Sequence, residues 1–340
     1  MNIKKNSHDH FTRVLGLSLL LFLAMSPLAV WADKTNDDQI VPPQKFQFEL
    51  FGGYTTLNPS DLNLFVSYDN TIQTFSYDAY FDYLRTNSQI QSWTKNQDSE
   101  RQKIKRAFPF GARLKFHLNQ TIALSIGLRY LTSSHDSNIE LQYTRNEFFN
   151  EQYREELVYS PYSLSAKAYI PTLGIHIMKK LKNALTLEGF LAGGLMFARC
   201  KYLSDWTYEW WIQGANYNWL TFQNSGTLEE KGHGIGIALD VGGRLAYPLF
   251  KSLGIFLEAG YAYQVAKNIS GGGSEVRDDS TEIWDGRWGI KREKMTTPWG
   301  ELEFELPTNY WPEGTDERRI RDFELDLSGF QLRLGLSYRF

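Results

Sequence analysis

The chain has 340 residues, of which 15% are aromatic, and its 36 basic and 39 acidic residues nearly balance. This balance argues against nucleic acid as a partner, because nucleic-acid-binding domains carry a concentrated basic surface. The only cysteine is Cys200, so a disulfide within the chain is excluded. No metal-ligand cluster, phosphate loop or nucleotide fingerprint occurs, so the sequence predicts no catalytic, cofactor-binding or metal-binding residue.

The N-terminus has the order of a secretory signal peptide. Basic residues precede an apolar run over 14–25, and a small-residue site ends at Ala32. This arrangement is typical of a cleaved signal that directs a chain through the inner membrane. We predict a signal peptide at 1–32 and a short polar, periplasmic N-terminal tail at 33–44.

The remaining chain alternates apolar and polar residues with a period of two. After Ala32 no run approaches the roughly 20 apolar residues of a transmembrane helix. Alternation over segments of 10 residues or more is instead typical of strands with two different faces, at about the length that a tilted strand needs to cross a bilayer. The eight predicted strands are 45–57, 107–118, 121–132, 166–179, 184–199, 233–247, 254–266 and 326–340.

The connections between these strands alternate in length. Three are short, at 119–120, 180–183 and 248–253, and four are long, at 58–106, 133–165, 200–232 and 267–325. Short periplasmic turns and longer extracellular loops are expected of an outer-membrane barrel. A count of ten strands stays open, because Leu62–Tyr68 within the first long connection has the composition of a strand.

The last strand is the most distinctive. Over 330–340 (FQLRLGLSYRF) every second residue is apolar, and the chain ends on Phe340. In a transmembrane strand the apolar face meets lipid and the polar face meets the lumen. This ending resembles the C-terminal signal of bacterial outer-membrane barrels, and the resemblance implies that Tyr338 and Phe340 are read by the barrel-assembly machinery.

These features together resemble the small outer-membrane barrels of the OmpA, OmpX and OmpW type in Gram-negative bacteria. The resemblance covers 45–340 and rests on architecture and the terminal strand. It implies an all-β, up-and-down, eight-stranded antiparallel transmembrane β-barrel with long extracellular loops, with ten strands as the alternative. It also implies an outer-membrane location, with membrane lipid and lipopolysaccharide as partners.

The inward face of the predicted barrel carries charges of both signs. Charges enclosed in a narrow barrel require partners, because an isolated buried charge is very costly. We therefore predict a polar interior network of Glu49, Arg113, Lys115, Arg129, Glu188, Asp240, Arg244, Glu258 and Arg333.

The long connections contain every tryptophan that follows the signal peptide. Disordered segments are poor in aromatics, so we expect these connections to be ordered, as strands that extend beyond the membrane. The densest group is the candidate recognition surface for an extracellular ligand or host surface, and consists of Trp206, Trp210, Trp211 and Trp219. The sequence thus favours a structural or adhesion-type role.

Two other functions stay open. The inward arginines allow a narrow porin-like channel for small polar or anionic solutes, since a basic lining favours anions. Small barrels also include lipid A-modifying hydrolases and acyltransferases, and His135, beside Ser133, Ser134 and Asp136, or His233 would be their candidate bases. The expectation is nevertheless that the protein is not an enzyme.

Overall fold

A computed structural model describes residues 45–57, 59–87, 89–97, 103–146, 152–181, 184–214, 217–277, 280–297, 300–310 and 320–340. The predicted signal peptide and N-terminal tail lie outside the described residues. The described chain is nearly all-β, with one long helix.

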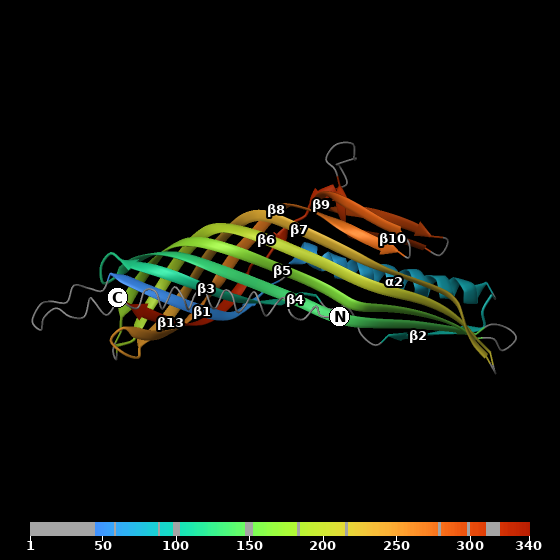
Figure 1. Cartoon of the computed structure of the whole chain (residues 1–340), viewed down its shortest axis with the longest axis horizontal. Coiled ribbons are helices and arrows are strands. Elements are labelled where there is room, and N and C mark those ends of the chain that lie inside the picture. The colour runs from blue at the N-terminus through green and yellow to red at the C-terminus, as the bar shows by residue number, and fades with distance from the viewer. Residues whose placement is uncertain are drawn as a thin grey trace, which may run out of the picture.

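Eight strands pair in a ring, each antiparallel to both of its neighbours (Figure 1). The members are β1 (Phe46–Thr56), β3 (Arg106–His117), β4 (Ile122–Asn146), β5 (Gln152–Lys180), β6 (Thr186–Gly214), β7 (Tyr217–Pro248), β8 (Leu253–Arg277) and β13 (Gly329–Arg339). Each member pairs with the next in this order, and β13 also pairs with β1, so the ring of pairings has eight members rather than ten.

Five of these strands, β4 to β8, have 25 residues or more and are much longer than the ring requires. β5 has 29 residues and β7 has 32, whereas β1 and β13 have 11 each. The connections at 133–165 and 200–232 are therefore hairpins of continuous strand, which leave the ring as a curved sheet (Figure 1). We call the parts of β4, β5, β6 and β7 within these two ranges the extension.

The last long connection, 267–325, also forms strands. β9 (Ser280–Thr297) pairs with the end of β8, and β10 (Gly300–Tyr310) pairs with β9, so both continue the sheet outside the ring. Two short strands, β11 (Ile320–Asp322) and β12 (Leu325–Asp326), pair with β9 and β8.

The first long connection is helical at Leu62–Tyr68, where a loop or an additional strand was expected. It forms α2 (Ser60–Thr86), a helix of 27 residues, and the short strand β2 (Ser92–Gln97), which pairs with the far end of β4. Leu62, Phe65 and Val66 are buried at the spacing of one helix face, which a search for a period of two overlooks. In the described part of the chain, no helix is both long and apolar enough to span a membrane.

The two faces of the ring strands differ as the alternation predicts. On β5, the His176 side chain points inward and is 1% exposed, while its neighbour Ile177 points outward and is 61% exposed. The same contrast separates Lys115, fully buried, from Phe116 on β3. In this part of the ring the interior is therefore polar and the exterior apolar, the reverse of a water-soluble protein.

Both ends of the ring sequence meet at the end with short turns (Figure 1). The Phe340 backbone N–H donates to the Phe46 carbonyl at 3.1 Å, and the two rings stack with centroids 6.1 Å apart. At the predicted tight turn, the Asn119 side chain accepts from the backbone N–H groups of Thr121 and Ile122 at 2.8 and 2.7 Å. We call this the short-turn end, and the opposite one the extension end.

Candidate functional site

The ring interior near the short-turn end contains a group of ion pairs centred on Glu49. Its carboxylate lies 2.8 Å from Arg244 Nη1 and 3.2 Å from Lys115 Nζ, and all three side chains are buried. Lys115 also lies 2.5 Å from Glu188, on the opposite wall. The contacts join β1, β3, β6 and β7 across the interior, so each charge has an opposite partner.

A second group continues toward the extension end. Glu258 accepts from Arg333 Nη1 at 2.6 Å and from Arg113 Nη2 at 3.1 Å. Asp240 then accepts from Arg129 at 2.5 Å and lies 3.4 Å from Arg333. Arg113 Nη1 is 3.7 Å from Glu49 Oε2, which connects the two groups. The nine residues proposed as an interior network thus lie together inside the ring.

Three kinds of interior residue accompany this network beyond its predicted members. His176 lies between Glu188 Oε1 at 2.6 Å and Ser125 Oγ at 2.8 Å. Gln331 accepts from Arg129 at 3.2 Å. The Arg244 guanidinium lies 3.6 Å from the centroid of the Phe256 ring, a cation–π distance. The alternation with a period of two places these residues on the inward face, and this was the signal by which the sequence could have predicted them.

Toward the extension end, the interior changes from charged to apolar. Leu62, Phe65 and Val66 of α2 pack into a cluster with inward side chains of the ring strands, many of them alanines. The Phe65 ring stacks on Tyr202 with centroids 4.7 Å apart and meets Trp288 at 5.5 Å. We call this cluster the apolar plug; its buried members are Leu57, Leu62, Phe65, Val66, Ile104, Ala107, Leu131, Leu164, Ala166, Ala168, Ile170, Met196, Ala198, Cys200, Tyr202, Ala238, Ala266, Ile269, Trp288, Ile290, Phe323, Leu325 and Leu327.

Polar contacts fix the start of α2 to the chain around it. The Asn63 side chain donates to the Ile104 carbonyl at 3.0 Å and accepts from the Ile104 N–H at 2.9 Å. The Asp61 carboxylate accepts from the Glu324 N–H at 2.8 Å. Since both side chains are buried, their loss would leave unsatisfied backbone groups. The first turns of α2 are therefore held in the apolar plug by direction-specific bonds.

The plug also encloses the only cysteine. Cys200 is buried, and burial raises the pKa of its thiol well above the ordinary range. A thiol in this state is a poor nucleophile, because the thiolate is the reactive form. Cys200 therefore packs as a small apolar side chain.

The far half of α2 docks on the extension through a second aromatic cluster. Phe81 lies 5.7 Å from Trp93 and 5.1 Å from Tyr143 between ring centroids. The Tyr143 hydroxyl donates to Asp78 at 3.0 Å, and Trp93 Nε1 donates to Asp82 at 3.2 Å. This part of α2 is thereby attached to β2 and β4.

The four tryptophans of the candidate recognition surface do not form one exposed patch. Trp206 is half-buried and packs against this second cluster, facing α2. Trp210 shares its face of β6, whereas Trp211 lies on the opposite face and donates to Glu209 at 3.0 Å. The Trp219 side chain lies outside the described residues. Part of the group therefore supports the packing of α2.

The candidate catalytic histidines lie apart from each other. Alternation places Ser133 and His135 on the inward face of β4, and Ser134 and Asp136 on the outward face. Ser133 donates to the backbone carbonyl of Arg106. His233, on β7, lies 3.4 Å from the Ser270 hydroxyl. Within the described residues these side chains form no nucleophile–base–acid chain.

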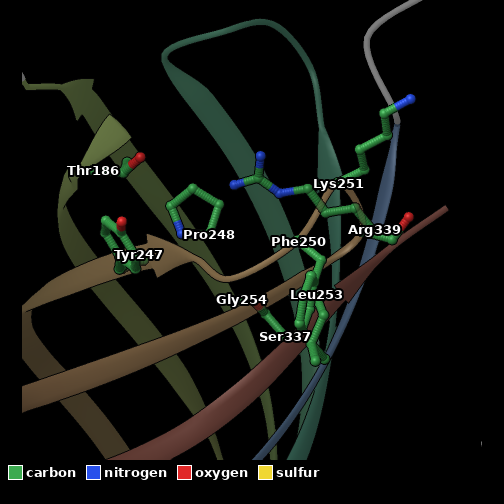
Figure 2. Close-up of a pocket in the computed structure, with 11 residues that line it drawn as sticks. Thr186, Tyr247, Pro248, Phe250, Lys251, Leu253, Gly254, Ser337 and Arg339 are labelled. Atoms are coloured by element: carbon green, nitrogen blue, oxygen red, sulfur yellow. The ribbon is translucent and has the colours of Figure 1, made fainter. Parts of the chain in front are cut away.

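A small pocket opens at the short-turn end, between the 249–252 turn and the neighbouring strands. Figure 2 shows its lining, which includes Thr186, Tyr247, Pro248 and Arg339. Its volume of about 20 Å³ is enough for a single water molecule. A second gap, beside Asp240, Glu258 and Arg333 of the network, has no volume left for water.

No protein-family model and no curated protein matches the sequence. Solved structures with some likeness include a major outer membrane protein from Thermus thermophilus, which is 11% identical with a TM-score of 0.30; the match covers 87% of this chain and 99% of that chain. The transport unit of the autotransporter AIDA-I from Escherichia coli is 10% identical with a TM-score of 0.18, and the match covers 93% of this chain and 97% of that chain. The outer membrane protease OmpT from Escherichia coli is 9% identical with a TM-score of 0.23, and the match covers 91% of this chain and 100% of that chain. Likeness at these scores carries no argument about fold or function.

Proposed function

We propose that this chain is an integral outer-membrane β-barrel that anchors an ordered surface structure, and that its interior is closed to solutes. The observation that carries the proposal is the inside-out distribution of polarity around the ring. Leucine, isoleucine and aromatic side chains cover its exterior, with Leu173 68% and Phe330 71% exposed. An apolar exterior of this extent needs lipid rather than water around it.

The position of the chain ends supports an orientation. Phe46 and Phe340 meet at the short-turn end, which in outer-membrane barrels faces the periplasm. The extension, α2 and the β9–β10 hairpin then lie outside the cell. This orientation agrees with a secreted chain whose last strand serves assembly through Tyr338 and Phe340.

The contents of the ring favour an anchor over a channel. Each of the inward arginines that would line a conduit contacts a carboxylate in the interior network. Toward the extension end from the network, the apolar plug fills the ring. A network of paired charges and a packed apolar cluster both obstruct the passage of water and ions. A channel would require both layers to move.

The extension supplies the surface for a structural or recognition role. Its two hairpins are continuous strands, and α2 and β2 brace them through aromatic packing and hydrogen bonds. A braced sheet presents side chains in fixed positions, which reduces the entropy lost when a partner binds. A glycan, a protein of a host surface or neighbouring lipopolysaccharide is the class of partner that we propose.

Epitope accessibility on intact cells tests the orientation. One tag is inserted at 215–216, between β6 and β7, and the control tag at 249–252, between β7 and β8. Antibody should label intact cells that carry the first tag, and should label the second only after the outer membrane is opened. Labelling of the control alone on intact cells, or of neither tag in the outer membrane, would contradict the proposal.

A shortened hairpin tests the recognition role. Replacing residues 209–223 with Asn-Gly joins Tyr208 to Asn224, which already face each other across β6 and β7. The shortened protein should retain its electrophoretic heat shift and its outer-membrane level, and lose adhesion to host cells or matrix. Unchanged adhesion would show that the removed tip is not the recognition surface.

A further inference from the structure

On the exterior of the ring, one row of outward-facing side chains is apolar and the next row toward the extension is basic. Tyr130, Tyr169, Phe197 and Ile235 are neighbours across β4, β5, β6 and β7, and form the last apolar row before the extension. Ile235 is 63% exposed, and the Tyr130 and Tyr169 rings pack with centroids 4.9 Å apart. In a membrane, aromatic rows of this kind mark the lipid–water interface.

The next outward-facing row consists of basic residues. Lys167 on β5 pairs with Arg199 on β6, and Arg199 pairs with His233 on β7. All three side chains are exposed. One row further, Lys201 faces Lys231. The basic row is defined here as Lys167, Arg199 and His233, with Lys201 and Lys231 behind it.

Within the described residues, Lys201 and Lys231, behind the basic row, have their charge balanced by a carboxylate of the protein. Glu229 lies 2.5 Å from Lys201 and 2.6 Å from Lys231. Partial burial favours a higher pKa for the Glu229 carboxyl, but the hydrogen bonds from both lysines outweigh burial and hold the pKa below its ordinary value. Glu229 therefore remains charged and neutralises part of the charge of Lys201 and Lys231.

The basic row itself has no such carboxylate in the described part of the chain. Across the described ranges, neither Lys167 nor Arg199 forms an ion pair, and the His233 ring meets only the Ser270 hydroxyl, at 3.4 Å. Like charges directly opposite each other on paired strands are destabilising. The neighbouring basic side chains thus repel each other in the isolated protein, and a bound anion would relieve this repulsion.

We propose that the basic row binds the phosphate groups of a phosphorylated glycolipid of the outer leaflet, whose acyl chains lie along the apolar row below. This inference rests on the proposed membrane location. Strands about 4.8 Å apart place the three side chains of the basic row across roughly 10 Å, which suits a lipid with more than one phosphate. Arginine adds bidentate recognition of a phosphate that lysine cannot provide.

The same strand offers a matched control. Lys179, on β5 at the short-turn end, is an exposed lysine beyond the other end of the apolar exterior, and Lys180 follows it. In the proposed orientation these two lysines face the periplasmic leaflet. A loss of general surface charge is therefore reproduced by K179Q/K180Q without touching the basic row.

The test measures lipid retained by the refolded mature protein after detergent exchange. Bisphosphorylated lipid A, monophosphorylated lipid A and phosphatidylglycerol are supplied separately and counted by native mass spectrometry. K167Q/R199Q should retain at least about ten-fold less bisphosphorylated lipid A than wild type, since the loss of charge-assisted hydrogen bonds to phosphate changes binding by this order. K179Q/K180Q should match wild type, and the monophosphorylated lipid should be retained less.

Three results would overturn the inference. These are equal retention by K167Q/R199Q and wild type, equal loss in the control variant, and displacement of the lipid by millimolar inorganic phosphate, which would indicate a site for the free ion. The electrophoretic heat shift and insertion into vesicles are recorded for every variant. A wild-type protein that does not insert refutes the membrane proposal itself, whereas an inserted protein with unchanged retention refutes only the lipid site.

Discussion

Arg244 and Glu49 join strands from opposite parts of the chain, with Nη1 of the arginine 2.8 Å from Oε2 of the carboxylate and both side chains buried. Breaking a buried pair leaves an uncompensated charge, which costs about 3–5 kcal/mol. We therefore expect Glu49→Leu to lower the free energy of unfolding by about that amount, measured by urea titration of the refolded protein in lipid. Arg244→Leu should behave similarly.

The double variant distinguishes a pair from two independent residues. If the contact is energetically coupled, E49L/R244L should be less destabilised than the sum of the single variants by more than about 0.5 kcal/mol. Additive effects would mean that the two charges act separately.

The apolar plug predicts a local effect of truncating Phe65. Its ring contacts Tyr202 and Trp288, so Phe65→Ala should leave a cavity and weaken the docking of α2 by about 3–5 kcal/mol. Because the ring strands keep their own pairings, the effect should appear as faster hydrogen exchange over 60–105 with an unchanged heat shift. The exposed Tyr83, replaced by alanine, is the control on the same helix. Equal protection of α2 in both variants would show that Phe65 does not hold the helix.

Two adjacent glycines on β6 should respond differently to a methyl group. A Cβ on Gly194 would overlap the Pro171 carbonyl oxygen on β5, whereas the nearest atoms to a Cβ on Gly193 are 3.9 Å away. Gly194→Ala should therefore destabilise the β5–β6 pairing by about 1–3 kcal/mol. Gly193→Ala should refold with wild-type yield. The comparison is made by the fraction of heat-shifted protein after refolding, and equal yields would contradict the close approach of β5 and β6.

Removal of Phe340 should impair assembly. Its N–H donates to the Phe46 carbonyl and its ring stacks on Phe46, where the first and last strands meet. Deletion should sharply reduce the amount of protein in the outer-membrane fraction, whereas Phe340→Tyr keeps an aromatic end and should assemble. Normal levels of the truncated protein would count against the terminal strand as an assembly signal.

The ring strands are predictable from sequence because their signal is local. A period of two separates Ile177 from His176 without knowledge of the partner strand, and turn residues such as Asn119 mark where strands reverse. The ion pairs across the interior could not be predicted in the same way. Glu49 and Arg244 are 195 residues apart, and they meet only after the strands between them have paired in register.

The helix α2 escapes a search for alternation because its apolar residues follow a different period. Leu62, Phe65 and Val66 are spaced for one face of a helix, although the composition of the segment also suits a strand.

The surroundings of the tryptophans could not be predicted from their closeness in sequence. Trp206 and Trp211 are close in sequence, yet one faces α2 and the other lies on the opposite face of β6.

We propose that the ring is a closed membrane anchor. The decisive measurement is the single-channel conductance of the purified, refolded mature protein in a planar bilayer, once the heat shift shows the protein to be folded. We predict no reproducible conductance steps from wild type. Steps that disappear or change size when Arg113 or Arg244 is replaced would contradict the claim and establish the interior as a conducting path.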